Sequence, residues 1–445
     1  MGIVIVALSL AHASRPADDP SEVPPKTRLA EVPELIYSNS PEDSWNRIFY
    51  YLFSRRVTAR LTADSPEGEP FRDVGGFLEF LHVQVSTRTI EMKEVGDRAI
   101  DPLYPSFLSD HGSRVVLQDP AYAGFRKSLE DALADSAVRS TVARAIMQND
   151  LWSAYDILYR YKGNKQRGEN VLAERSLEIL ELLGRLMVKI ALTPDEIRSL
   201  PDNYSVAQAA NPLPDVFKKN SGWVEVQWFP QRLHDFAVDY RRVTRVFLKP
   251  ARPQWDLQRF LNGFRRGDKD TVTNLDGVAL VIQPLIIDTK GQLRTANLST
   301  DVQVRIFEKN RQGTFQKTRI GIYELNRKRW MLQADSGGFV ERAESERVYL
   351  PAAGNDYGFA SPNTEISMNK PIPPLVVKQR TRCGFCHGEN NFTQLMTFSV
   401  KRSPKEGLGP PVRQLNSLAH QAADFVISEK TKREDWKTLR EYFRQ

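Results

Sequence analysis

The chain reads VLAERSLEILELLGRLMVKIA from Val171 to Ala191, the strongest helical pattern in the sequence. Its apolar residues recur at helical spacing and would line one buried face: Leu172, Ile179, Leu183, Leu186, Met187 and Ile190. The next residues, Thr193-Pro194-Asp195-Glu196, have the form of a capping box with proline at the first helical position. They predict a further helix that starts at once and ends before Pro201.

Two segments upstream of Val171 also have an apolar stripe at helical spacing. Ser40 fits an N-cap and Pro41 the first helical position, and the stripe that follows is Trp45, Ile48, Phe49, Leu52 and Phe53. The second stripe is Val138, Val142, Ile146, Leu151, Trp152, Tyr155, Leu158 and Tyr159. Residues 41–220 are therefore predicted to form a mainly helical domain, in which 77–85 fit either a strand or a buried helical turn.

The pattern changes at Gly222. Residues 223–228 alternate apolar and polar side chains, as a half-buried strand does. Further runs rich in Val, Ile and aromatic residues are Val243–Leu248, Val278–Asp288, Val302–Glu308 and Arg319–Leu325. Residues 289–292 fit a turn between two such runs. Residues 221–350 are therefore predicted to be a mainly antiparallel, β-rich domain.

The last part of the chain, residues 351–445, combines loop and helix signals. Residues 356–376 contain several prolines and fit a loop. Residues 412–428 and 432–443 have helical patterns. The expected fold class is thus an α+β multidomain protein with a helical N-terminal half, an antiparallel β-rich centre, and a loop-rich C-terminal segment with terminal helices.

The composition excludes several classes of protein. The chain has 445 residues, of which 41% are hydrophobic and 26% charged, values of an ordinary globular protein with two or three domains. Its two cysteines cannot form a disulfide framework. The net charge of +7, from 62 basic and 55 acidic residues, is too mild to indicate nucleic-acid binding. No stretch reaches the roughly 18 apolar residues of a membrane span.

The N-terminus has features of an export signal. Residues 1–10 are uncharged and mostly apolar, and Ala11-His12-Ala13 has the form of a signal-peptidase site. A basic segment before the apolar stretch is missing, so residues 1–13 are interpreted as a shortened signal peptide. A buried N-terminal strand is the alternative. Residues 14–40 contain several prolines and fit a linker. The protein is expected to be periplasmic or secreted.

The two cysteines lie in one short motif, Cys383-Gly384-Phe385-Cys386-His387. Cys-x-x-Cys-His is the attachment pattern of c-type haem. Two thiols at this spacing can form thioethers with the two vinyl groups of one porphyrin, and the adjacent imidazole can bind the iron. The motif therefore predicts one covalent haem c, held by Cys383 and Cys386 with His387 as the proximal ligand.

Three other sites use similar residues. A local Cys383–Cys386 disulfide is reasonable in an oxidising compartment. A zinc site would need a distant fourth ligand such as His420. A thioredoxin-like redox site would need the cysteines at a helix N-terminus after a strand, and the preceding sequence does not supply that context.

Two segments resemble known proteins. Arg382-Cys-Gly-Phe-Cys-His-Gly388 resembles the haem segment of c-type cytochromes, over about seven residues. Leu192–Tyr204 resembles a recurrent segment of large exported bacterial proteins of unknown function, which often carry one such cysteine motif near the C-terminus. This second resemblance implies export and a single C-terminal haem, but no particular activity.

Three residues are candidates for the sixth ligand of the iron: Met396, His420 and Met368, which precedes His387 by 19 residues. Met396 lies nine residues after His387, and His420 lies on the helix predicted from residue 412. Met396 also fits a core position between Leu395 and Phe398. A Met or His ligand would favour electron transfer, and an open position would favour ligand binding.

The expected function is electron transfer, or redox or ligand sensing through haem. The alternative is a non-enzymatic exported binding or assembly protein with a Cys383–Cys386 disulfide. No hydrolase, nucleotide-binding or dinucleotide-binding motif occurs. Basic clusters at 241–269 and 305–329 are candidate docking stripes for an acidic redox partner protein. The sequence does not specify an oligomeric state.

Overall fold

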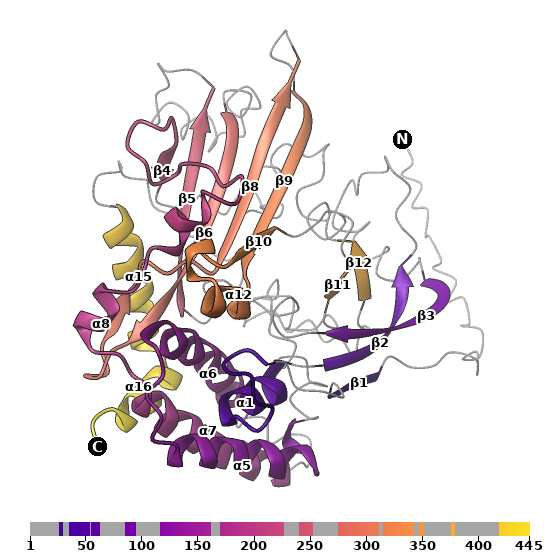
Figure 1. Cartoon of the computed structure of the whole chain (residues 1–445), viewed down its shortest axis with the longest axis vertical. Coiled ribbons are helices and arrows are strands. Elements are labelled where there is room, and N and C mark those ends of the chain that lie inside the picture. The colour runs from indigo at the N-terminus through magenta and orange to yellow at the C-terminus, as the bar shows by residue number, and fades with distance from the viewer. Residues whose placement is uncertain are drawn as a thin grey trace, which may run out of the picture.

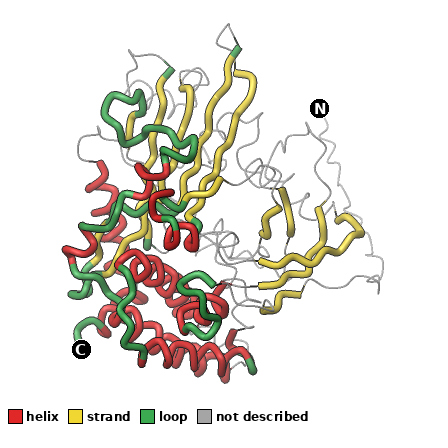
Figure 2. The backbone as a smooth tube through the Cα atoms, in the orientation of Figure 1, coloured by secondary structure: helices red, strands yellow, loops and turns green. Residues whose placement is uncertain are grey.

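The computed structural model describes residues 26–29, 35–53, 55–62, 85–94, 116–161, 170–226, 240–251, 275–310, 315–341, 347–350, 375–378 and 418–445. Helices gather at one end of the molecule and the strands of a large sheet at the other, with a smaller sheet to one side (Figure 2). Two kinds of element thus occupy separate regions, which confirms the predicted α+β class.

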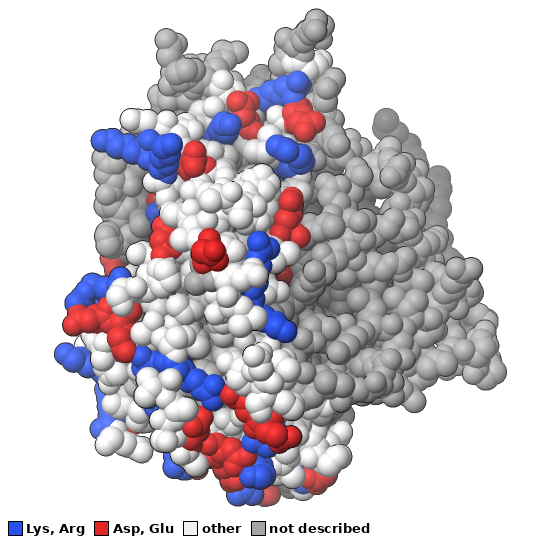
Figure 3. Space-filling view, in the orientation of Figure 1, with Lys and Arg blue, Asp and Glu red and all other residues white. Residues whose placement is uncertain are grey.

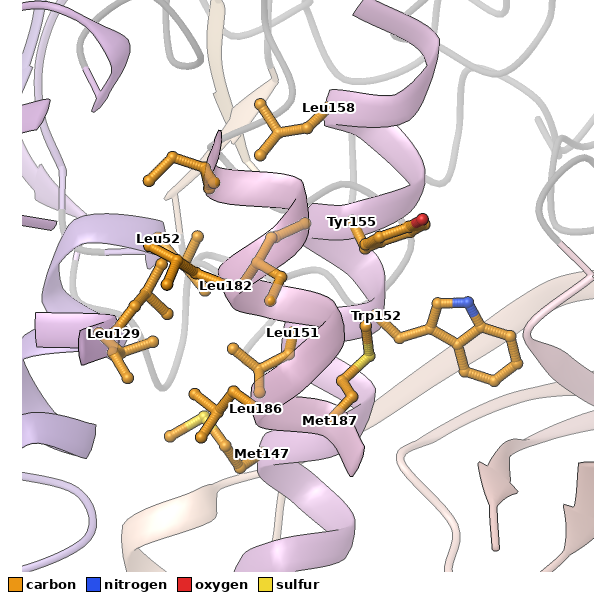
Figure 4. Close-up of a cluster of buried hydrophobic side chains, with 14 of the residues drawn as sticks. Leu52, Leu129, Met147, Leu151, Trp152, Tyr155, Leu158, Leu182, Leu186 and Met187 are labelled. Carbon is orange, nitrogen blue, oxygen red and sulfur yellow. The ribbon is translucent and has the colours of Figure 1, made fainter. Parts of the chain in front are cut away.

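Four helices form the helical layer: α1 (Ser44–Phe53), α5 (Ala121–Ala134), α6 (Thr141–Tyr161) and α7 (Asn170–Lys189). They lie together below the large sheet in Figure 1, and α6 packs along α7. The stripe predicted for α7 is fully confirmed, because all six of its residues are buried. Figure 4 shows how Leu182, Leu186 and Met187 of α7 interdigitate with the side chains of α6. This apolar contact is the centre of the largest core.

Two short helices follow α7, namely α8 (Pro194–Arg198) and α9 (Asn203–Ala207). The capping box predicted for α8 is confirmed: Thr193 Oγ1 accepts from the backbone N–H of Glu196, and the Glu196 carboxylate accepts from that of Thr193. The reciprocal pair satisfies two backbone donors that a helix N-terminus leaves open. The helix also ends before Pro201, as predicted.

The large sheet consists of β4 (Val224–Val226), β5 (Arg242–Pro250), β6 (Leu275–Ile287), β7 (Leu293–Thr295), β8 (Asp301–Lys309), β9 (Phe315–Leu325) and β10 (Phe339–Glu341). The strand order is β10-β9-β8-β6-β5-β4, and β7 pairs with the end of β6. Every described pairing is antiparallel, as the sequence predicts. The predicted turn between β6 and β7 is also present, with Gly291 at a φ of 66°.

One face of the large sheet is covered by α9 and the chain that follows it. Tyr204 stacks edge-on with Phe217, and Phe217 with Phe247 of β5, at centroid distances of 4.8 and 5.3 Å. The Tyr204 hydroxyl donates to the Pro214 carbonyl at 2.6 Å, which satisfies the polar end of this buried ring. The connection between the helical layer and the sheet is thus part of the sheet's own core.

A second sheet was not predicted. It contains β1 (Lys26–Leu29), β2 (Arg55–Thr62), β3 (Val85–Glu94), β11 (Arg347–Leu350) and β12 (Leu375–Lys378). Its pairs are antiparallel except β12–β2, which is parallel. β1 falls in the predicted linker and β2 and β3 in the predicted helical domain, so both expectations need correction there. The ambiguous segment 77–85 lies outside the described residues except for Val85, where β3 begins.

The C-terminal helices α15 (Leu418–Lys432) and α16 (Glu434–Tyr442) return to the body of the protein. α15 lies against β5, and α16 contacts α6 and α7 (Figure 1). Trp436 and Leu439 of α16 share one core with α6, α7 and the end of β6. The helical layer, one end of the sheet and the C-terminal helices are therefore packed around a common interior, which crosses the sequence boundaries predicted at 220 and 350.

Two local predictions for the helical layer were wrong. α1 begins at Ser44 rather than after Ser40, because Asp43 Oδ1 accepts from the backbone N–H of Trp45 at 2.8 Å and takes the capping role. Val138 does not belong to the buried face of α6, since it lies before the helix and its side chain is 94% exposed. A short helix, α12 (Arg327–Leu332), and a single 3-10 turn at 334–336 were also not foreseen.

Candidate functional site

The predicted haem motif lies in the sequence between β12 and α15. Cys383, Cys386, His387 and Met396 all fall outside the described residues. His420 falls in the first turn of α15, where the backbone alone is described. The helical position predicted for His420 is therefore confirmed, whereas its ligand role and the thioether roles of the cysteines stay predictions.

Among the described residues, α6 carries a concentration of buried polar side chains. Its residues 145–156 are buried without interruption, so this helix has no solvent-facing side over three turns. Met147 and Leu151 lie in the core shared with α7, whereas Ala145 and Ile146 pack toward the sheet. Several polar members face the sheet, the start of α12 and the C-terminal helices. These buried polar residues are Gln148, Asn149, Asp150, Ser153 and Asp156. Buried polar groups are costly unless they are paired, so their partners define what this region does.

Gln148 joins α6 to the end of β6. Its side-chain amide donates to the Ile287 carbonyl at 2.9 Å and accepts from the Ile287 N–H at 2.8 Å. The amide therefore replaces a missing strand partner at this point of β6. Because both bonds are buried, they fix the position of the helical layer relative to the sheet.

Asp150 binds Arg327 at the start of α12. The guanidinium donates through Nε and Nη2 to the two carboxylate oxygens, at 3.0 and 2.7 Å. It also lies over the rings of Phe49 and Phe53 of α1, at 5.6 and 6.0 Å from their centroids. This bidentate geometry and the aromatic contact are what make arginine suited to a buried ion pair.

A second ionic group, the Asp156 cluster, consists of Asp156, Arg241, Lys430, Arg433 and Asp435. Lys430 Nζ lies 2.7 Å from Asp156 Oδ2 and 3.3 Å from Asp435 Oδ2, and its side chain is 0% exposed. Arg241 Nε lies 3.0 Å from Asp156 Oδ2, and Arg433 Nη2 lies 2.9 Å from Asp435 Oδ2. The cluster ties α6, the start of β5 and both C-terminal helices together.

The electrostatics of the Asp156 cluster favour the charged form of Asp435. Burial by itself raises the pKa of Asp435, but the charge of Lys430 and hydrogen bonds from Arg433 and the Trp436 N–H more than offset this, so that the pKa of Asp435 is lowered from 3.8. Lys430 Nζ also lies 5.2 Å from the centroid of the Trp152 ring, which packs against Trp436. A fully buried lysine is thus held by two carboxylates and an aromatic face.

These features serve to position elements, and the described residues contain no group of three or more His, Cys, Asp or Glu side chains that could hold a metal ion. Within the same residues, no helix is both long and apolar enough to cross a bilayer.

Parts of the basic clusters predicted as docking stripes are buried, and the prediction needs correction at those residues. Arg241, Arg242, Arg305 and Arg327 are all buried and cannot present a surface to a partner. In the described part of the face shown in Figure 3, lysine and arginine side chains are interspersed with acidic ones. Residues 252–269 of the first cluster lie outside the described residues.

The sequence analysis missed the polar residues of α6 and their partners. One signal was available: Gln148-Asn149-Asp150 interrupts the predicted apolar stripe between Ile146 and Leu151. Three consecutive polar residues within a strong helix are consistent with a helix buried on every side. Their partners could not be found in this way, because Arg327 is 177 residues from Asp150 and Lys430 is 274 residues from Asp156.

Comparisons with known proteins add no family to this description. No protein-family model, no curated protein and no solved structure matches the chain.

Proposed function

We propose that the chain is an exported protein that carries one covalent haem c and acts in electron transfer, or in redox or ligand sensing through the haem. The observation that carries the proposal is the motif Cys383-Gly-Phe-Cys-His387, in a chain with no other cysteines. The apparent export signal at residues 1–13 supports it independently, since haem c is attached outside the cytoplasm.

The donor set suits the group. Cys383 and Cys386 would hold the porphyrin through two thioethers, each made by adding a thiol S–H across one vinyl group, which needs no external oxidant. His387, next to the second thioether, would supply its imidazole as a tethered ligand to the iron. The bound haem would supply one-electron chemistry or an iron site for a small ligand.

The test is whether the purified full chain carries covalent haem when it is made in a host that matures c-type cytochromes. After denaturation, the wild-type band should retain peroxidase activity in the gel and give a pyridine haemochrome spectrum. Cys386→Ala should lose the double attachment and most of the stain. His234→Ala, a histidine far from the motif in sequence, is the control and should keep it. A colourless wild-type protein with free or disulfide-linked thiols would contradict the proposal and favour the alternative binding or assembly protein.

The sixth ligand decides between electron transfer and ligand binding. If Met396 binds the iron, Met396→Ala should change the reduced spectrum and open the iron to carbon monoxide, while the haem stays covalently attached. If His420 binds it, His420→Ala should do so instead. A third outcome is that both variants keep the wild-type spectrum and that the wild type binds carbon monoxide rapidly. That result would indicate an open sixth position and a sensing role.

A further inference from the structure

Asn149, on the side of α6 that faces the sheet, has a buried polar atom that the described part of the chain does not satisfy. Asn149 is 6% exposed, and its Oδ1 has no hydrogen-bond partner among the described residues. Its neighbours differ, since Gln148 and Asp150 each make two side-chain hydrogen bonds to distant parts of the chain. A buried amide that lacks a protein partner requires one from a bound molecule.

Asn149 lines a pocket between α6 and the large sheet. The pocket is walled by apolar side chains, including Ile146 and Leu298, and by three further polar residues: Thr300, Glu324 and Arg327. Its empty space is about 370 Å³ including the open mouth, but the enclosed part has room for about one water molecule. The pocket is therefore polar, partly enclosed and very small.

The fixed groups around the pocket offer both donors and acceptors. Thr300 stands where the chain enters β8, and its backbone pairs with Ile282 of β6 and Leu325 of β9. Arg327 is held by Asp150, so the guanidinium cannot move into the space without giving up two hydrogen bonds. A molecule bound here would touch the helical layer on one side and the sheet on the other.

We propose that this pocket is a binding site for one internal water molecule, which donates a hydrogen bond to Asn149 Oδ1 and bonds on its other side to the polar wall of Thr300 and Glu324. A water has the size, and the two donors and two acceptors, that this space requires. It adds to the contact between α6 and the sheet that Gln148 makes with Ile287.

The test is a crystal structure of the full chain at a resolution that defines ordered water. The wild type should show a density peak about 2.7–3.2 Å from the Asn149 side-chain amide and from a second pocket group. Asn149→Leu, which has a similar shape but no hydrogen-bonding group, should lose the peak. Ser176→Ala is the matched control, because the Ser176 hydroxyl is equally buried but already donates to the Leu172 carbonyl at 2.7 Å.

The same comparison can be made in solution, where Asn149→Asp keeps an acceptor at this position. Oxygen-17 relaxation dispersion should count one long-lived water fewer in Asn149→Leu than in the wild type, Asn149→Asp and Ser176→Ala. An equal count in all four proteins would overturn the proposal. So would a wild-type crystal structure in which the Asn149 amide bonds to a protein group, or in which no peak lies beside it.

Discussion

The two sides of α6 are equally buried but are packed by different chemistry. On one side Met147, Leu151 and Leu158 lie in the apolar core shared with α7 (Figure 4). On the other, Asp150 and Asp156 are held by arginine and lysine side chains from distant segments. Apolar contacts accept many partners of suitable volume, whereas a buried charge accepts few. The apolar side therefore gives cohesion, and the polar side determines which segments are brought to the helix.

The sharpest way to break the polar side is to remove Lys430. Lys430→Met leaves Asp156 and Asp435 facing each other across a buried space with less positive charge, and we expect a loss of about 3–5 kcal/mol in the free energy of unfolding. Lys432→Met is the control: that side chain is 65% exposed and pairs with Glu429 at the surface, so the loss should stay below about 1 kcal/mol. Urea unfolding of both variants measures the difference. Equal losses would show that the buried charge has no special role.

The apolar side is tested by Leu151→Ala. Leu151 is fully buried in the largest core, and the substitution should cost about 2–5 kcal/mol through lost burial and the cavity that remains. Leu177→Ala on α7 is the matched control, because Leu177 is 54% exposed and its truncation should change stability by about 0.5 kcal/mol or less. Thermal or urea unfolding measures both losses of stability. A loss in Leu151→Ala as small as that in the control would contradict the account.

Acid should weaken the polar side and spare the apolar side. The pKa of Asp435 is lower in the folded protein than its ordinary 3.8, so near and below that pH the unfolded chain binds more protons. The stabilising contribution is complete well above pH 3.8 and is lost as the pH falls through the lower folded-state value. The free energy of unfolding, measured between about pH 6 and about pH 2, should fall less steeply with acidification in Asp435→Asn than in the wild type. Leu151→Ala should keep the wild-type slope, and a change in slope there would argue against the assignment.

Features of the fold that depend on local sequence patterns could be predicted, and features that depend on distant partners could not. The stripe of α7 and the capping box at Thr193 are local patterns, and both were predicted with the correct residues. Strands β4, β5, β6, β8 and β9 of the large sheet were also predicted, because alternation and β-branched residues are local signals. The short strands β7 and β10 were not. The strands of the smaller sheet were missed, since they are held by partners elsewhere in the sequence: β1 and β3 pair with β2, and β12 pairs with both β2 and β11.

For the candidate sites, the sequence indicates the haem motif but not the Asp156 cluster. The haem motif occupies five consecutive residues, so its chemistry can be proposed from the sequence alone. The Asp156 cluster joins residues 156, 241 and 430–435, and nothing in the sequence indicates that they meet. Of the predicted site residues, the structure adds only that His420 lies on α15, one helix that the cluster holds in place.

The most direct test of the haem proposal is the intact mass of the exported full chain, measured under denaturing conditions together with its absorbance. The account predicts a mass that exceeds the processed polypeptide by one haem, with Soret absorbance in the same chromatographic peak. Cys383→Ala/Cys386→Ala should have the polypeptide mass and no visible absorbance. A wild-type protein with the polypeptide mass alone, after production in a strain that matures other c-type cytochromes, would contradict the account.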